Sequence, residues 1–449
     1  MDGAASIEAR GRPALRRELG LGDLALFNIA AVVGIRWLAA AAHAGPGALA
    51  LWLLAAALFF VPSALAVSRL GARFPEEGGL YVWTRHSFGD WHGFLCGWCY
   101  WLSNLFYFPN LLLAGLGMAV YTLGPEFHGL SEDRTLLVGG SLLVLWIGAA
   151  TNLIGLRVGK WTETLGAAAT YAAGFLLMGA GAAAWLLPGP ARKPGSLWPR
   201  WDWGTVNFWS QIAFAFGGLE LGAMMGGEIR DPARTVPRAA WISGAAIATF
   251  YLCGTAAMLV LLPPEQINIM TGMAQAGAQA SRILGAAWIG PVLAGLITLG
   301  ITGQLGAWLA GAARVPFAMG LAGRLPREFA RVSPRWGTPH VAILTQAGAC
   351  TVFLIGMLAG ETLRVGYQLL VDMTVISYFI PFTYLFLAAQ RQGVRISLAG
   401  LAVTILAIAV SLIPPAEAHS PWLFQMKLAV GCALLIGTAR MVFKRAGQA

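Results

Sequence analysis

Long apolar segments constrain the fold of this chain more than any other feature. Of its 449 residues, 57% are hydrophobic and only 11% are charged, whereas soluble domains carry roughly 25% charged residues. A membrane-crossing helix needs about 20 mostly apolar residues, and we count about twelve such segments. They lie near residues 21–43, 47–70, 92–120, 134–154, 161–187, 205–229, 239–262, 287–312, 339–358, 363–389, 396–413 and 421–442. The sequence therefore predicts an all-α integral membrane protein without a separate soluble domain.

The positive charges indicate how this protein is oriented. If the N-terminus is placed in the cytoplasm, 22 of the 30 Lys and Arg residues fall in cytoplasmic segments and six on the opposite side. The other two, Arg36 and Lys427, lie inside apolar segments. Such an excess is the positive-inside pattern of membrane proteins. We therefore expect a multi-pass protein of the inner (plasma) membrane with both termini cytoplasmic. The net charge of +10 reflects this rim and does not indicate nucleic-acid binding.

Arg36 is the most unusual residue of the first apolar segment, and Gly34 lies two residues before it. A charge at bilayer depth costs from about 2.5 to more than 10 kcal/mol, depending on the reference state. Glycine also weakens a helix interior. We therefore expect the first helix to break within the stretch Val32–Leu38, and the broken backbone to line a substrate site.

A second glycine pair, Gly217-Gly218, interrupts the sixth apolar segment. Two breaks five spans apart are typical of an inverted repeat of five plus five helices. This pattern predicts a ten-helix core at 21–389, with repeats at about 21–187 and 205–389. An N-terminal tail (1–20) precedes the core. Helices eleven and twelve and a short C-terminus follow it (390–449). Close helix packing explains most of the other glycines.

Four motifs occur in a fixed order along the chain. They are Ala44-Gly45-Pro46, then Pro75-Glu76-Glu77-Gly78-Gly79-Leu80-Tyr81-Val82-Trp83, then Phe214-Ala215-Phe216-Gly217-Gly218-Leu219-Glu220, and Glu228 with Pro232, Arg234 and Pro237. Each motif is weak alone, but their order and spacing are specific. Together they resemble the amino acid–polyamine–organocation (APC) superfamily. Within it, the chain is most similar to bacterial amino acid permeases near the glutamate/GABA antiporter group.

This resemblance implies the LeuT-type fold, with two inverted five-helix repeats, broken helices 1 and 6, and two extra helices. It also implies secondary transport of amino acids or related amines by alternating access. In such permeases the backbone of the two broken helices binds the substrate, and Phe214 falls where the family has an aromatic gate. The residues that match these positions are Val33, Gly34, Ile35, Arg36, Phe214, Phe216, Gly217, Gly218, Leu219 and Glu220.

The chain departs from the family pattern at the first break. The usual motif is Gly-Ser-Gly-Ile-Phe, whereas this chain has Gly34-Ile35-Arg36-Trp37-Leu38. Many members also carry a Lys in span five where we align Thr170. One hypothesis is that Arg36 supplies the fixed positive charge that Na⁺ or the Lys supplies elsewhere, with Glu220 as its partner between substrates. The alternative is a structural Arg36–Glu220 pair without a ligand role.

Other polar residues within the apolar segments are weaker candidates. In span three, Tyr100, Asn104 and Tyr107 share one helical face, which either lines the cavity or makes hydrogen bonds between helices. Glu163 and Asp372 are candidate proton carriers, but both lie near an estimated span end, so the sequence favours a solvated position for each.

Further candidates lie outside the breaks. Glu228 and Arg230 end span six, where they either gate the inner mouth or anchor the helix by the positive-inside rule. Cys96 and Cys99 are read as packing residues, so the sequence indicates no metal site and no cofactor.

Among function classes, the sequence favours a secondary active transporter that works by symport with H⁺ or by exchange. Span eight lacks the oxygen ligands that Na⁺ prefers. The sequence shows no nucleophile–base pair that would indicate an enzyme and no filter-like repeat that would indicate a channel. The alternative is a transport-inactive amino acid sensor on the same fold. The expected partners are a small amino acid or amine and the lipid bilayer, with the chain a monomer or loose homodimer. Arg36 favours an anionic or zwitterionic substrate over a polyamine, and Glu220 favours an amine on it.

Overall fold

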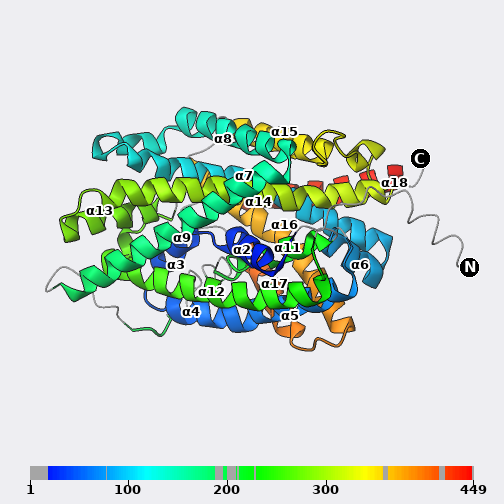
Figure 1. The fold of residues 1–449 in the computed structure, drawn as a ribbon, viewed down its shortest axis with the longest axis horizontal. Coiled ribbons are helices and arrows are strands. Elements are labelled where there is room, and N and C mark those ends of the chain that lie inside the picture. Colours follow the sequence, from blue (N-terminus) through cyan, green and yellow to red (C-terminus); the bar gives the residue numbers. More distant parts are fainter. Residues whose placement is uncertain are drawn as a thin grey trace, which may run out of the picture.

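The computed structural model describes residues 19–76, 78–187, 196–199, 209, 212–226, 229–269, 271–356, 363–413 and 420–446. Within these ranges the chain is helical and contains no strand; Leu19 and Ile229 form an isolated parallel bridge. The long helices lie side by side, which gives an elongated bundle (Figure 1). The all-α prediction is therefore confirmed. Of the predicted N-terminal tail, only Leu19 and Gly20 are described.

The helical elements follow the predicted apolar segments along the chain. The first half contains α2 (Leu21–Val32), α3 (Arg36–His43), α4 (Ala48–Ala55), the π-helix η1 (Ala56–Phe60), α5 (Val61–Arg73), α6 (Leu80–Phe88), α7 (Asp90–Ala119), η2 (Val120–Thr122), η3 (Pro125–Glu132), α8 (Arg134–Ile154) and α9 (Leu156–Leu186). The second half contains α11 (Leu219–Met224), α12 (Pro232–Leu261), η5 (Pro264–Gln266), α13 (Gly272–Leu284), α14 (Ile289–Leu321), η6 (Arg327–Ala330), α15 (His340–Gly356), α16 (Leu363–Arg391), α17 (Ser397–Ser411) and α18 (Pro421–Ala446).

Eight helical segments in the described part are long and apolar enough to cross a membrane. Three shorter apolar helices, Ile212–Met224, His340–Gly356 and Ser397–Ser411, accompany them. In a bilayer, every backbone N–H and C=O must be satisfied within the protein, and helices do this locally. The chain is thus a multi-pass membrane protein. The count of about twelve spans and the inverted repeat stay predictions.

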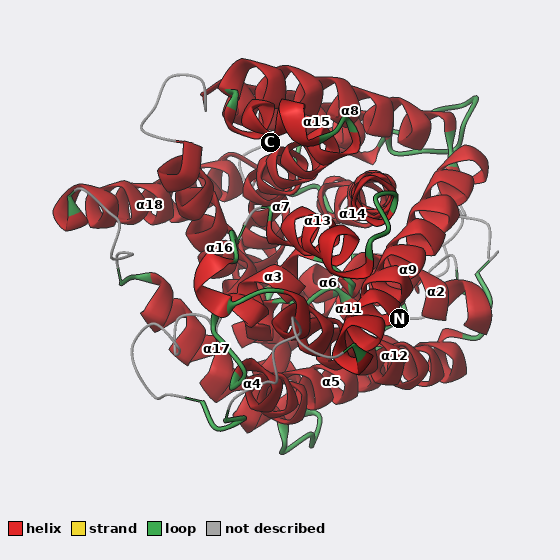
Figure 2. Cartoon of the chain, turned by 90° about the vertical axis from the view of Figure 1, so that its left-hand side faces the viewer, coloured by secondary structure: helices red, strands yellow, loops and turns green. Residues whose placement is uncertain are grey.

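The long helices differ in how deeply they are enclosed. The most apolar windows of α16, α7 and α14 are 78%, 72% and 67% buried, whereas that of α18 is only 17% buried. Figure 2 shows α18 at the edge of the bundle and α3 and α11 in its interior. The short helices α3 and α11 therefore lie in the protected centre of the bundle, where most of their residues are buried.

Both expected helix breaks are present. The first apolar segment forms α2, which ends at Val32, and α3, which begins at Arg36. In the sixth segment, Ala215–Gly218 form a turn between the helical residues from Ile212 and α11. The rest of the predicted sixth span (205–229) lies partly outside the described residues.

Direct backbone contact fixes α9 against α14. A Cβ on Gly166 of α9 would lie 2.4 Å from the Cα of Gly303 on α14, too close for any side chain. Small residues allow such approach between membrane helices. Gly179, on the same helix, has no atom within 4 Å of its would-be Cβ.

We expect Gly166→Ala to destabilise the protein, because backbone atoms of α14 cannot move aside as a flexible side chain could. Overpacking of this kind costs about 1–3 kcal/mol, so thermal unfolding of the purified protein in detergent should begin at a lower temperature. The matched control, Gly179→Ala in α9, should leave it unchanged or raise it slightly. Equal behaviour of the two variants would contradict the close contact.

Candidate functional site

The first break leaves carbonyl groups at the end of α2 without helical partners, as any helix C-terminus does. Helix α14 supplies donors for them. The indole N–H of Trp308 donates to the carbonyl of Ala31 at 2.9 Å. The Nε2 of Gln304 lies 3.3 Å from the carbonyls of both Ala31 and Val33. The break is therefore supported by side chains from a neighbouring helix.

The second break requires its two glycines for different reasons. Gly218 has a φ of +120°, a conformation that side chains with a Cβ rarely adopt. A Cβ on Gly217 would lie 2.4 Å from the hydroxyl oxygen of Tyr378 on α16. The Gly218 N–H donates to Oε2 of Glu220 at 3.0 Å, so this carboxylate satisfies the start of its own short helix.

Tyr251 of α12 joins the two breaks. Its hydroxyl accepts a hydrogen bond from the Gly34 N–H at 3.1 Å. The same hydroxyl lies 2.7 Å from the carbonyl of Val32 and 3.0 Å from that of Ala215, and it donates its single hydrogen toward them. Its ring stacks on Trp52 with centroids 4.3 Å apart. One side chain thus connects the backbones of both broken helices.

Arg36 is buried at the start of α3, only 3% exposed. Its Nη1 donates to Oδ1 of Asn110 on α7. Its guanidinium carbon lies 4.4 Å from the ring centre of Trp37 and 5.0 Å from that of Tyr107, both within cation–π distance. The expected ion pair with Glu220 is not formed, so that part of the hypothesis was wrong.

Glu220 has its own set of donors, which explains why it does not pair with Arg36. It is fully buried. The hydroxyls of Tyr378 and Tyr100 donate to its Oε1 at 2.6 and 3.0 Å. Phe214 contacts one aromatic partner of each charged group, with its ring 4.9 Å from that of Tyr378 and 5.4 Å from that of Trp37. The carboxylate and the guanidinium thus have separate sets of partners, which Phe214 connects.

The structure brings most of the sequence-predicted residues together around these breaks. Of the span-three face, Tyr100 reaches Glu220 and Tyr107 reaches Arg36. Asn104 is buried, but its amide donates to the carbonyl of Tyr100 within its own helix at 2.7 Å. Sequence reasoning missed Tyr251, Asn110 and Tyr378. A signal for them exists, because a polar atom of a side chain buried in a membrane span needs a partner.

The two other candidate proton carriers lie on different helices. Asp372 is 3% exposed, so the expected solvated position is wrong. It lies more than two turns into α16, and that helix is central to the bundle. Glu163 is half-buried on α9. It faces α14, because its Cγ lies 3.6 Å from the position of a Cβ on Gly306.

The predicted gate after the second break is only partly described. Glu228 lies outside the described residues. The Arg230 N–H donates to the carbonyl of Leu19 at 2.9 Å, and the Arg230 carbonyl accepts from the hydroxyl of Thr235 at 2.7 Å. This backbone segment therefore ties the start of α2 to the start of α12. The gating role of Phe214, Glu228 and Arg230 stays a prediction.

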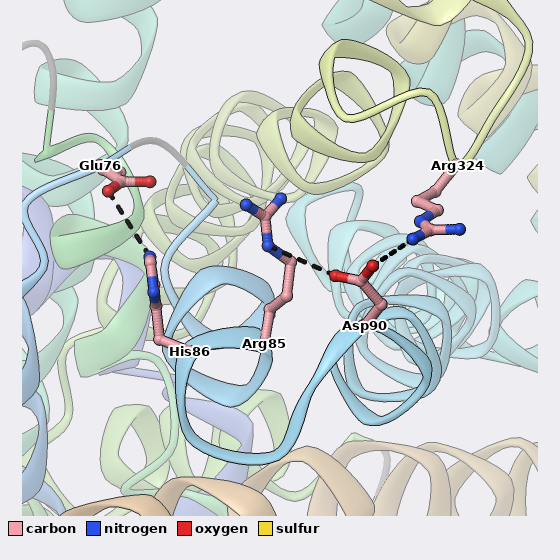
Figure 3. Close-up of polar contacts among 5 residues, drawn as sticks. All are labelled: Glu76, Arg85, His86, Asp90 and Arg324. Carbon is pink, nitrogen blue, oxygen red and sulfur yellow. Dashed lines mark hydrogen bonds and ion pairs between the residues drawn. The ribbon is translucent and has the colours of Figure 1, made fainter. Parts of the chain in front are cut away.

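A second polar cluster, not expected from the sequence, lies where α6 meets α7 (Figure 3). Oδ1 of Asp90 is 3.7 Å from Nε of Arg85, and Oδ2 pairs with Arg324, just beyond α14. Nε2 of His86 lies 3.5 Å from Oε1 of Glu76. These side chains are 24–52% exposed, and exposed ion pairs contribute only about 0–1 kcal/mol each. The cluster orients helix ends more than it stabilises the fold.

We expect Tyr251→Phe to destabilise the protein, because the ring is retained while the Gly34 N–H and two backbone carbonyls lose their common partner. An unsatisfied buried group costs about 1–3 kcal/mol. The measurement is thermal unfolding in detergent. Tyr171→Phe is the matched control, since the Tyr171 hydroxyl has no hydrogen-bond partner within the described ranges. If both variants unfold at the same temperature as the parent, the Tyr251 hydroxyl does not contribute to the stability of the fold.

Comparison with known proteins agrees with this architecture. A family model described as amino acid permease matches residues 19–430. An uncharacterized transporter of Legionella pneumophila is 25% identical over 94% of this chain and 95% of its own length. The serine/threonine exchanger of Bacillus subtilis is 26% identical over 84% of each chain. A probable polyamine transporter of Arabidopsis thaliana is 29% identical over 72% of this chain and 62% of its own.

The family match covers more than nine-tenths of the chain, from Leu19 to Val430. It includes both breaks and all of the contacts described above. The motifs that suggested the APC superfamily therefore belong to one continuous homologous region. The chain belongs to the amino acid permease family of the APC superfamily.

Proposed function

We propose that this protein is a secondary active transporter that moves amino acids or related amine-bearing solutes by alternating access. The observation that carries the proposal is the pair of broken helices, joined through Tyr251 and flanked by buried Arg36 and Glu220. Discontinuous helices near the bilayer midplane are where transporters of this kind place their substrates. The names of the relatives, a serine/threonine exchanger and a probable polyamine transporter, support the same class.

The wider arrangement follows from this proposal. The chain lies in the inner (plasma) membrane with about twelve spans, two inverted five-helix repeats and cytoplasmic termini, as the Lys and Arg distribution favours. It acts as a monomer or loose homodimer. The backbone around Val33–Ile35 and Phe216–Leu219 faces the substrate, and Phe214 is the gate above it. No residue needs to form a covalent bond with the solute, because transport requires only binding and movement.

Glu220 is our candidate for the coupling proton. It is fully buried, and two tyrosine hydroxyls and one backbone N–H donate to it, while Arg36 does not contact it. Among the described residues it has hydrogen-bond donors but no counter-ion, so hydrogen bonds stabilise its charge. A buried carboxylate of this kind exchanges a proton when its donors rearrange. Movement of Tyr378 or Tyr100 would thus link the carboxylate to the gate at Phe214.

We expect Glu220→Gln to reduce substrate accumulation driven by a proton gradient by about tenfold or more, because Gln keeps the shape but carries no titratable proton. The assay uses proteoliposomes loaded at one pH and diluted into another, with a radiolabelled amino acid mixture outside. Exchange at equal pH should persist, since it needs no net proton movement.

Glu163→Gln and Asp372→Asn are the matched comparisons, because both remove a carboxylate from other helices. If Asp372→Asn alone removed the gradient dependence, coupling would belong to α16 instead of Glu220. If reconstituted protein bound amino acids but exchanged none of them, the transporter proposal would fail in favour of an amino acid sensor on the same fold.

A further inference from the structure

We propose that Arg36 forms a built carboxylate site, so that this protein takes solutes bearing a carboxylate and rejects polyamines that lack one. The inference rests on the proposed transport function and names the substrate class of the same site. It starts from an uncompensated charge. Arg36 is 3% exposed, and no carboxylate oxygen of the described residues lies within ion-pair distance of it. A buried charge with no opposite charge beside it is unfavourable even when neutral groups contact it, so an anion would complete the site.

The guanidinium has one edge left for that anion. Its Nη1 is occupied by the amide oxygen of Asn110, and its faces are covered by Trp37 and Tyr107. The Nε atom is buried and has no hydrogen-bond partner among the described residues. An arginine pairs with a carboxylate through two parallel N–H donors in its plane. Nε and its neighbouring amino group form such a pair in the plane of the guanidinium.

Several backbone N–H groups at the first break already have hydrogen-bond partners, so fewer of them are available to an anion than at an ordinary helix N-terminus. The Gly34 N–H already donates to Tyr251. The N–H groups of Trp37 and Leu38 donate to the carbonyls of Gly34 and Ile35 at 2.9 and 3.2 Å. The eight-residue helix α3 begins at Arg36, and a helix N-terminus adds partial positive charge to this region. Recognition of a carboxylate therefore depends mainly on the Arg36 side chain.

Because Glu220 does not pair with Arg36, the site favours solutes with a carboxylate over diamines. The carboxylate of Glu220 accepts from Tyr378 and Tyr100 and forms no ion pair with Arg36, so it does not offset the charge of Arg36 directly. A diamine brings only positive charge toward a fixed guanidinium, and like charges repel strongly where water is scarce. A solute with a carboxylate neutralises Arg36 instead, and its amine remains free to face Glu220.

The test compares solutes that differ only by one carboxylate. Suitable pairs are ornithine with putrescine, lysine with cadaverine, and arginine with agmatine. Binding to the purified full-length chain is measured by thermal shift, and exchange is measured in proteoliposomes with the same six compounds. The carboxylate-bearing member of at least one pair should bind about tenfold or more tightly than its decarboxylated partner. Arg36→Gln should remove this preference, and Arg36→Lys should restore part of it.

Asn110→Asp is the sharpest variant, because it is nearly isosteric and places a carboxylate directly against Arg36. The unliganded protein should become more heat-stable, while binding of the carboxylate compounds falls about tenfold or more. A purely structural Arg36 would gain the same stability without losing binding. Unchanged preference in both Arg36→Gln and Asn110→Asp would overturn the inference.

The two proposals fail in different ways. If no compound exchanges across the membrane but the carboxylate compounds still stabilise the parent protein and not Arg36→Gln, transport fails and the carboxylate site stands. If putrescine, cadaverine and agmatine exchange as well as their amino acid partners, transport stands and the carboxylate site fails.

Discussion

The hydroxyl group of Tyr251 is the interaction on which the centre of this structure depends. A membrane interior offers no water to satisfy backbone groups, yet two helices break there. Tyr251 accepts from the N–H of Gly34 and lies within hydrogen-bond distance of carbonyls on both sides. Trp308 and Gln304 supply the remaining donors. The breaks are therefore possible because three side chains on α12 and α14 replace the missing helical partners, and those helices hold the broken pair together.

The sequence was informative where a single residue type conflicts with its surroundings. The long apolar segments predicted the helical membrane class. Gly34, Gly217 and Gly218 weaken helices, and Arg36 is costly in an apolar segment, so both breaks could be predicted as well. Contacts between distant segments could not. Tyr251, Asn110 and Tyr378 lie in ordinary apolar runs, and nothing in their local pattern reveals that they meet Gly34, Arg36 and Glu220 in space. The Arg36–Glu220 pair failed for a related reason: opposite charge suggests attraction, but only the fold decides adjacency.

The two buried charges illustrate how one family scaffold accommodates a local change. Arginine at the first break would be unfavourable on a bare helix, but the guanidinium is covered by Trp37 and Tyr107 and bound by Asn110. Glu220 meanwhile uses tyrosine hydroxyls from α7 and α16. Because Phe214 packs toward both groups, displacement of this ring would alter both environments at once. The arrangement of helices is shared with the family, whereas these contacts around Arg36 and Glu220 depend on the side chains of this chain.

The Tyr251 hydroxyl can also change its hydrogen-bond partner. A phenol owns one hydrogen, and here two carbonyls, of Val32 and Ala215, compete for it. Rotation about a single C–O bond therefore transfers the stronger bond from one broken helix to the other, and this needs no movement of the ring stacked on Trp52. The carbonyl that does not receive this hydrogen keeps a lone pair that can accept another hydrogen bond. The Tyr251 hydroxyl can therefore alternate its hydrogen bond between the two broken helices while its ring stays in place.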